Sequence, residues 1–328
     1  MLLRAHAAGQ LECPGQQISF FMARRILVTG ANKGIGLAIV KAILDQSAEN
    51  SVILCARDGG RGQEAAAALV AANPELGTRL STELLDVCGS EESIRETAAR
   101  VAAGGPLFAI VNNAGVLSAP PADIFETNLY GVKKVCDAFI EQIQPGGRIV
   151  NISSGAAPGF LEKCSDSKKE LFAGPDVTWA QIEDQADVFL QLLTGPNGVE
   201  ACESAGFGKG DATFFAYGCS KCLLNSFTIA LARAMRERQI TVNSCSPGMI
   251  MTDLFAPMAA SKGQSVEELA AAFGALPPEQ GTVSTLRLLF APAQELGTGR
   301  YFGSDGLRSP MAIYRKPGTA EYDGSGLI

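Results

Sequence analysis

Short apolar runs alternate with longer amphipathic segments along most of the chain from Arg25 onwards. The runs are rich in Val, Ile and Leu, which is typical of buried strands. The segments between them repeat apolar residues every three or four positions, which is typical of helices packed on one face. Strand–helix alternation at this spacing predicts a parallel sheet with helices on both faces. We therefore expect an α/β fold built on a single doubly wound parallel sheet.

The individual elements follow from the same pattern. Strands are predicted at 26–29, 51–56, 80–85, 107–111, 147–152, 240–243 and 301–302. Helices are predicted up to 44 and at about 62–72, 90–103, 128–143, 179–193, 217–235, 261–272 and 278–290.

The pattern also divides the chain. Residues 22–302 are predicted to form one domain, preceded by an extension at 1–21 and followed by a Gly-rich tail at 303–328. The extension has no periodicity and makes a poor signal peptide, although an organelle-targeting leader stays open. The tail is expected either to be disordered or to fold over the site.

A helical insertion is predicted at 155–212. Thr178 and Gln181 make a capping box there, and an amphipathic stripe from Trp179 to Leu193 follows it. The alternative is a loosely attached surface loop, but such a loop would leave the apolar side chains of the stripe exposed to solvent.

Composition narrows the function. The 328 residues carry a net charge of -7, which argues against nucleic acid as the main partner. No stretch approaches roughly 18 consecutive apolar residues, so no membrane span is expected. The nine scattered cysteines, including Cys219 and Cys222, are expected to be reduced thiols with structural roles. The single histidine, His6, argues against a Ser/His/Asp triad and a histidine zinc site, and no metal is expected.

A glycine-rich turn follows the first predicted strand. Gly30, Gly34 and Gly36 have the spacing Gly-x-x-x-Gly-x-Gly between a strand and a helix. Glycines let the backbone approach a pyrophosphate, and the helix N-terminus favours its negative charge. The motif alone is weak evidence, and its place after the first strand strengthens it.

The end of the second predicted strand indicates which dinucleotide binds. A carboxylate there binds the free 2′-hydroxyl of NAD, whereas an arginine accommodates the 2′-phosphate of NADP. Ala56 and Arg57 therefore favour NADP(H), with Lys33 as a second nearby cation. The carboxylate of Asp58 argues for NAD instead, unless this residue caps the next helix. The alternative for Arg57 is a solvated charge at a strand end.

A tyrosine and a lysine four residues apart are the centre of the candidate chemistry. On a helix, Tyr217 and Lys221 lie on one face with their Cβ atoms about 5–6 Å apart. An ammonium this close favours phenolate, so we expect the pKa of Tyr217 to fall from about 10 toward neutrality. The phenol then exchanges a proton with a substrate oxygen. A surface Tyr/Lys pair is the ordinary alternative.

Five signatures in order resemble the short-chain dehydrogenase/reductase family. They are Thr29-Gly-x-x-x-Gly-Ile-Gly36, Asn112-Asn-Ala-Gly115, Asn128, Ser154 and Tyr217-x-x-x-Lys221. The resemblance covers about Arg25 to Tyr301 and implies a Rossmann fold. The glycine loop, the end of the second strand and the long segment before Tyr217 are similar to those of the NADPH-dependent carbonyl reductases.

The resemblance implies a role for each matching residue. Tyr217 is expected to be the general acid, and Lys221 to lower its pKa and hold the nicotinamide ribose. Ser154 is expected to orient the substrate oxygen, and Asn128 to hold a water that links Lys221 to solvent. The other cofactor-binding residues that the resemblance implies are Gly30, Asn32, Lys33, Gly34, Ile35, Gly36, Arg57, Asp86, Val87, Asn113, Ala114, Gly115, Pro247, Gly248 and Thr252.

Each of these residues also has an ordinary structural explanation. Ser154 can simply end a strand, Asn113 can be a turn former, and Asn128 can be a helix N-cap. Pro247 and Gly248 form a turn pair in any protein.

The sequence predicts NADPH-dependent reduction of a small-molecule ketone, aldehyde or quinone to an alcohol. The alternatives are an NAD(P)-dependent alcohol, steroid or terpenoid dehydrogenase and a non-catalytic NADP-binding sensor. Phe214, Phe215 and Met249 are expected to give the substrate an adaptable apolar wall. The insertion resembles one that covers the surface through which other family members assemble, so a cytoplasmic monomer is expected.

Overall fold

The protein is described by a computed structural model over residues 24–210, 212–253, 256–261, 263–272 and 274–325. The extension predicted at 1–21 lies outside this part of the chain. In the described ranges no helix is both long enough and apolar enough to cross a membrane.

The part of the chain that the structure describes contains one eight-stranded sheet. Its strands are β1 (Arg24–Val28), β2 (Asn50–Ala56), β3 (Leu80–Leu84), β4 (Leu107–Asn112), β5 (Ile143–Ile152), β6 (Thr241–Cys245), β7 (Tyr301–Phe302) and β8 (Arg308–Ser309). The helices are α1 (Gly34–Gln46), α2 (Gly59–Ala72), α3 (Glu91–Ala102), α4 (Pro121–Phe125), α5 (Gly131–Phe139), α6 (Ala156–Leu161), α7 (Asp166–Ala173), α8 (Trp179–Thr194), α9 (Gly198–Ser204), α10 (Ala212–Ala234), α11 (Ala256–Ser261), α12 (Val266–Ala272), α13 (Val283–Phe290) and α14 (Ala293–Leu296). A π-helical turn, Glu126–Tyr130, joins α4 to α5.

The sheet order is β3-β2-β1-β4-β5-β6-β7-β8. All neighbouring strands are parallel except β7 and β8, which run antiparallel. The strand order reverses between β1 and β4, and in open α/β sheets ligands bind at such a switch point, beyond the carboxyl ends of the strands. The predicted doubly wound fold is confirmed.

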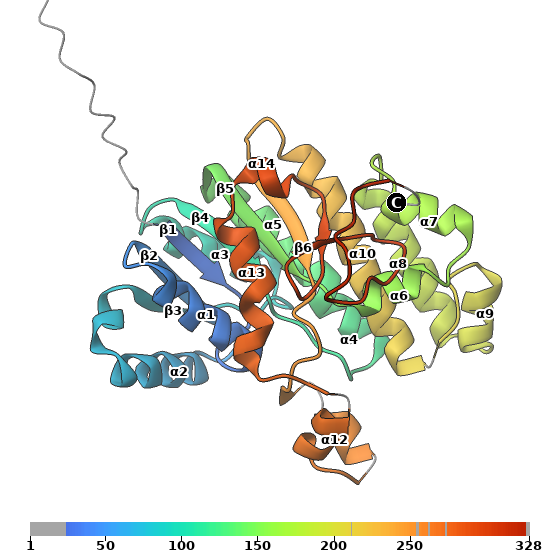
Figure 1. Cartoon of the computed structure of the whole chain (residues 1–328), viewed down its shortest axis with the longest axis horizontal. Helices are drawn as coiled ribbons and strands as arrows, with labels where there is room; N and C mark the ends of the chain where they lie inside the picture. Colours follow the sequence, from blue (N-terminus) through green and yellow to red (C-terminus); the bar gives the residue numbers. More distant parts are fainter. Residues whose placement is uncertain (1–23, 211, 254–255, 262, 273, 326–328) are drawn as a thin grey trace, which may run out of the picture.

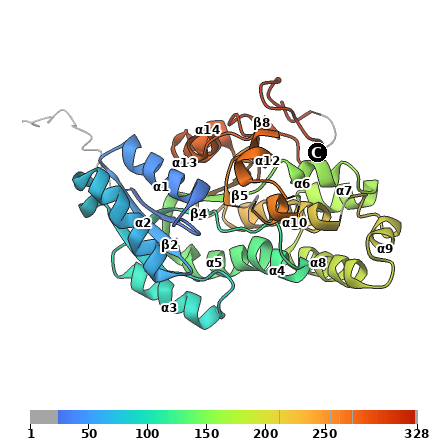
Figure 2. The same cartoon turned by 90° about the horizontal axis from the view of Figure 1, so that it is seen from below.

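Alternate residues of each strand enter two different cores. Ile26 and Val28 of β1 pack in one apolar cluster, whereas Leu27 between them packs in the other. This alternation follows from the pleat, which points successive side chains to opposite faces. Figure 2 shows α1, α13 and α14 along one face of the sheet and α3, α5, α4 and α8 along the other. Helices thus cover both faces, and the strands β2, β4, β5 and β6 are largely buried, whereas the edge strand β3 is partly exposed.

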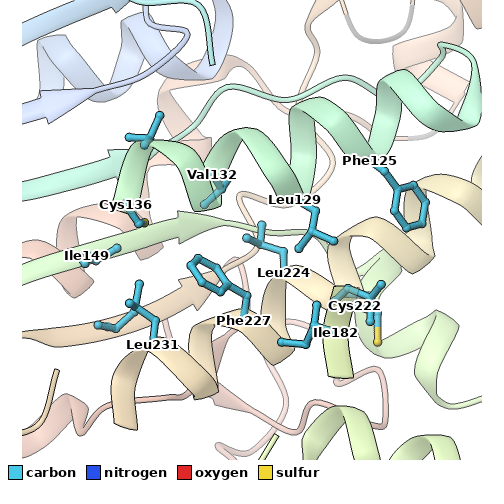
Figure 3. Packing of buried hydrophobic residues seen from close by; sticks show 14 of the residues in the cluster. Phe125, Leu129, Val132, Cys136, Ile149, Ile182, Cys222, Leu224, Phe227 and Leu231 are labelled. Carbon is cyan, nitrogen blue, oxygen red and sulfur yellow. The ribbon is translucent and has the colours of Figure 1, made fainter. Parts of the chain in front are cut away.

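The longest helix, α10, packs against the turn that precedes α5 and against α5 itself. Figure 3 shows Leu129 and Val132 facing Leu224 and Phe227 of α10. All four side chains are buried. Because these contacts are apolar and close to β5, they fix the position of α10 relative to the carboxyl edge of the sheet.

Four helices, α6 to α9, precede α10, where the sequence predicted one amphipathic helix. The capping box of Thr178 and Gln181 starts α8 as predicted. Phe189 of α8 is fully buried among four other aromatic rings. Its ring centre lies 5.6, 6.1, 5.2 and 5.1 Å from those of Phe125, Phe160, Phe207 and Phe215, respectively. The apolar stripe of α8 therefore has a core to pack against.

Three further details differ from the sequence-based expectations. Helix α10 starts at Ala212, so Tyr217 lies in its second turn rather than its first. The strand β8 was not predicted, because two residues carry no readable periodicity. Phe215, expected in the substrate wall, is 2% exposed and belongs to the aromatic core.

Cys219 and Cys222 are also buried, and burial raises the pKa of both thiols.

We expect Phe189→Ala to lower the free energy of unfolding by about 3–5 kcal/mol, because it leaves a cavity between α8, α4, α6 and α10. Urea denaturation followed by circular dichroism measures this change. Phe214→Ala is the matched control, since Phe214 is 44% exposed, and it should cost about 1 kcal/mol or less. Equal losses for the two variants would contradict the packing described here.

Candidate active site

The glycine loop between β1 and α1 has backbone geometry that only glycine supports. Gly30 has φ +61°, and Gly34 has φ +56°. A Cβ at Gly36 would lie 2.5 Å from Asn113 Nδ2 and 2.6 Å from the Gly30 carbonyl oxygen. Lys33 occupies the N-cap of α1 without a side-chain hydrogen bond to the helix. The first N–H groups of α1 are therefore open to an anion.

Thr29 and Asn113 join this loop to the end of β4. Thr29 Oγ1 accepts hydrogen bonds from the N–H groups of Asn113 and Ala114, both at 3.0 Å. Asn113 Nδ2 donates to the carbonyl oxygens of Thr29 and Gly30, at 2.9 and 3.0 Å. From the sequence, Thr29 was part of a motif without a role of its own, and Asn113 was expected to bind the cofactor. In the structure, both residues fasten the two loops together.

A pocket of about 570 Å³ opens beside the glycine loop, at the carboxyl ends of the parallel strands. Its lining includes every predicted cofactor-binding residue except Gly248. Of the predicted catalytic residues, Tyr217 and Lys221 line it, whereas Ser154 and Asn128 do not. A Cβ at Gly248 would lie 3.0 Å from Ser304 Cβ, so Gly248 packs against Ser304, which follows β7, instead of lining the pocket.

Sequence reasoning missed a set of lining residues. They are Leu85, Cys88, Val116, Leu117, Ser118, Thr127, Ile152, Ser153, Met251, Asp253 and Pro278. Most of them directly adjoin a predicted motif in the sequence. That proximity was the available signal, because their own residue types carry no distinctive chemistry.

Two predicted cations, Arg57 and Lys33, line the pocket. Arg57 is exposed at the end of β2 and lines the pocket. Asp58 accepts a hydrogen bond from the Arg61 N–H at 3.1 Å and so caps α2, as the alternative reading required. The ammonium of Lys33 contacts Asp253 Oδ2 at 2.6 Å, and its expected role as a second cation near Arg57 stays a prediction. Lys33 therefore reaches toward the segment after β6.

Tyr217, Ser154 and Lys221 meet where β5 ends against α10. The Ser154 hydroxyl lies near the Tyr217 phenol and, as a hydrogen-bonding neighbour, lowers its pKa. Lys221 is 4% exposed, and its ammonium donates to the Ile152 carbonyl oxygen at 2.7 Å. The same ammonium lies 5.9 Å from the centre of the Tyr217 ring. The second serine of the pair is the one that faces the phenol, since Ser153 is buried and donates to the Lys221 carbonyl oxygen.

The expected lowering of the Tyr217 pKa by Lys221 is wrong for this arrangement. Removal from water raises the pKa of the half-buried Tyr217 phenol, and its hydrogen bond with Ser154 lowers it by less. Burial lowers the pKa of Lys221 to about 8. The physical reason is that the ammonium is bound to the Ile152 carbonyl rather than to the phenol oxygen. Tyr217 consequently keeps its proton at neutral pH.

Asn128 lies in the π-helical turn and is fully buried. Its side chain accepts from the Val116 N–H and donates to the Val116 carbonyl, both at 2.9 Å, and also donates to Ser220 Oγ at 3.1 Å. A Cβ at Gly115 would lie 3.1 Å from Asn128 Oδ1 and 3.5 Å from Lys221 Nζ. The amide thus clamps the loop after β4, close to the ammonium, and its expected role as a water ligand stays a prediction.

The sequence model of the short chain dehydrogenase family matches residues 24–163 and 199–263. The chain belongs to this family. The family resemblance inferred from the five signatures is therefore confirmed, and the protein is an oxidoreductase of the short-chain dehydrogenase type.

Named relatives within the short-chain dehydrogenase family are carbonyl reductases. The chain is 33% identical to carbonyl reductase [NADPH] 1 of Sus scrofa over 298 residues, which is 86% of this chain and 92% of the relative. It is 30% identical to carbonyl reductase [NADPH] 1 of Homo sapiens over 267 residues, or 77% of this chain and 91% of the relative.

Solved structures support the fold. Salutaridine reductase from Papaver somniferum superposes with a TM-score of 0.68 and 23% identity, covering 85% of this chain and 99% of that one. The NADPH-bound carbonyl reductase from chicken fatty liver gives a TM-score of 0.57 at 23% identity, covering 87% and 97%.

Lys221 makes stability depend on pH with a defined sign. Burial lowers its pKa from 10.5 to about 8, so between these values the unfolded chain binds more protons than the folded chain. The free energy of unfolding should therefore rise with pH, by about 2 kcal/mol between pH 7 and 9.5 from this group. Urea denaturation across this range should show the wild type gaining that amount relative to Lys221→Met.

The control is Lys209→Met, because the Lys209 side chain is 80% exposed. This variant should follow the wild type at every pH. Parallel curves for the wild type and Lys221→Met would contradict the expected burial of the ammonium.

Proposed function

We propose that the protein reduces the carbonyl group of a ketone, aldehyde or quinone to an alcohol, with NADPH as hydride donor and Tyr217 as general acid. The observation that carries this proposal is that Tyr217 and Lys221 line the pocket of the glycine loop, with the Ser154 hydroxyl next to the phenol. The names of the relatives in pig and human, carbonyl reductase [NADPH] 1, support it.

The pocket fits a dinucleotide. Its volume of about 570 Å³ lies within the range of ligand sites. The Oγ1 atom of Thr252 is buried in this lining and has no hydrogen-bond partner among the described residues. Such a group normally requires a partner, which a bound ligand can supply.

Particular residues would hold each part of NADPH. The N–H groups at the start of α1 would bind the pyrophosphate, because Gly34 and Gly36 keep side chains out of the way. Arg57 would pair with the 2′-phosphate. Lys221 would contact the nicotinamide ribose. When bound, NADPH supplies the hydride.

Side chains of the protein then stabilise the developing negative charge and supply the proton. Negative charge develops on the substrate oxygen as the carbonyl carbon is reduced, and the Ser154 and Tyr217 hydroxyls stabilise it. Tyr217 gives its proton to this oxygen and becomes phenolate. The nearby Lys221 ammonium stabilises that phenolate, since opposite charges attract strongly where water is excluded. A phenol with a raised pKa is protonated at neutral pH, so Tyr217 starts in the form that can donate a proton.

The monomeric and cytoplasmic state predicted from the sequence remains part of this proposal. Helices α6, α7 and α8 all contact α10. They cover the helix surface that the family resemblance connects with assembly, and this supports a monomer.

We expect Tyr217→Phe to lower kcat for carbonyl reduction by about 10²–10⁴-fold or more, because the variant keeps the ring but loses the transferable proton. Oxidation of NADPH followed by absorbance with a panel of quinones, aldehydes and ketones measures the loss. NADPH binding, measured by calorimetry, should change little. Full activity in this variant would overturn the role of Tyr217, and no turnover by the wild type despite tight NADPH binding would favour a sensor.

We expect Arg57→Ala to raise the dissociation constant for NADPH about tenfold and to leave that for NADH unchanged, because only NADPH has the 2′-phosphate. Calorimetry with both cofactors measures the two values. Arg61→Ala is the control, since Arg61 is exposed, pairs with Asp58 and does not line the pocket. A wild-type preference for NADH would contradict the assignment of Arg57.

A further inference from the structure

The chain after β7 folds back beside the candidate active site. β8 pairs antiparallel with β7, and residues 310–325 continue along the molecule beyond it. Figure 1 shows this dark red segment near β6, α6 and α10. The segment at 303–325, called the C-terminal segment below, therefore lies on the side of the site formed by Ser154 and α10.

A largely buried ion pair holds the C-terminal segment in place. Arg315 and Asp305 form a salt bridge, with side chains only 7% and 19% exposed. Arg315 Nε also donates to Ser309 Oγ at 2.9 Å, and the Gly318 N–H donates to Asp305 Oδ2 at 2.8 Å. Partial burial opposes ionisation of Asp305, but these hydrogen bonds together hold its pKa below the usual range. The turn between Asp305 and Arg315 is thus a defined structure rather than a loose end.

This turn brings Tyr314 against the backbone next to Ser154. A Cβ at Gly155 would lie 2.8 Å from Tyr314 Cε2 and 3.5 Å from Cδ2, so the ring rests on the Gly155 backbone. The Gly155 N–H donates to Ser246 Oγ at 3.2 Å, which fixes the surface on which the ring lies. Tyr314 nevertheless remains 50% exposed. The rest of its surface is therefore available to another molecule.

A buried tyrosine lies within electrostatic reach of both Tyr314 and Tyr217. Burial raises the pKa of Tyr301, its hydrogen bond with Ser246 lowers it, and Tyr314 and Tyr217 raise it further. Tyr301 is 3% exposed and belongs to β7. Tyr301 is thus a buried neighbour of both tyrosines, and the direct contact with the site is the one that Tyr314 makes with Gly155.

Exposed apolar side chains lie on the neighbouring segments. Phe214, 44% exposed, is three residues before Tyr217 on α10. Met249, 48% exposed, follows Gly248, which packs on Ser304 of the C-terminal segment. Both side chains belong to parts of the chain that also carry pocket residues, namely Tyr217 on α10 and Pro247 after β6.

From this arrangement we infer that Tyr314 is a specificity-determining residue that forms an aromatic wall of the carbonyl site and selects flat, aromatic carbonyl compounds such as quinones. The inference rests on the proposed reductase function and names its substrate class. An aromatic ring stacks well on another aromatic face, which a small aliphatic aldehyde cannot offer. The Tyr314 hydroxyl takes no part in the chemistry.

The test uses the full chain and two probes, 1,4-naphthoquinone and propanal, with NADPH oxidation as the readout. Tyr314→Ala should raise KM for naphthoquinone about tenfold, while kcat and the KM values for propanal and NADPH stay within about twofold. Tyr314→Phe should behave as the wild type, because it keeps the ring. Tyr322→Ala is the matched control, since Tyr322 belongs to the same segment but its ring lies 5.1 Å from the Arg308 guanidinium.

A double-mutant cycle tests the contact itself. Gly155 has φ -60° and ψ -18°, so alanine fits the backbone there, but its Cβ would displace the Tyr314 ring. Gly155→Ala should therefore also raise KM for naphthoquinone in the wild-type background. In the Tyr314→Ala background it should add little. Additive effects would contradict the contact.

The outcomes separate this inference from the proposed function. If the wild type reduces both probes and Tyr314→Ala keeps the wild-type KM for naphthoquinone, the inference is wrong and the reductase function stands. An equal rise of KM for both probes would also overturn it, because it would indicate a general disturbance. If the wild type oxidises NADPH with neither probe nor any other carbonyl compound, the proposed function fails and the inference fails with it.

Discussion

The hydrogen bond from the Lys221 ammonium to the Ile152 carbonyl ties the catalytic helix to the central sheet. The bond is buried, and breaking it would leave a buried ammonium without this partner. Because Ile152 ends β5 and Lys221 lies one turn after Tyr217, this bond sets the distance between the phenol and Ser154. The apolar packing of α10 on α5 brings the helix to the sheet, and the polar contact fixes its register.

A second polar connection performs the same task for the cofactor side. Thr29 and Asn113 exchange hydrogen bonds between the ends of β1 and β4, the two strands that flank the switch point. Glycines at positions 30 and 36 are required because the two loops approach so closely. The pocket is therefore held open by a few loop-to-loop hydrogen bonds on a rigid sheet, which is the preorganisation that binding and catalysis require.

Much of this could be predicted from the sequence, because strand ends of a parallel sheet gather at one edge and motifs at those ends must converge. The glycine loop, Arg57, Tyr217 and Lys221 line one pocket for this reason. The prediction failed where the outcome depends on competing partners. Lys221 has a backbone carbonyl within reach, so spacing alone misjudged its effect on the Tyr217 pKa. Tyr314 could not be predicted, since only the fold of the C-terminal segment brings it back to Gly155.

The contact between Lys33 and Asp253 has a kinetic consequence. It joins the glycine loop to the segment after β6, so it crosses the rim of the pocket, and both side chains are well over half exposed. An ion pair in water is worth at most about 1 kcal/mol and weakens as ionic strength rises. It can therefore break and re-form without disturbing the sheet below. Passage of a nucleotide across this rim should depend on the salt concentration of the medium, while the chemistry deeper in the site does not.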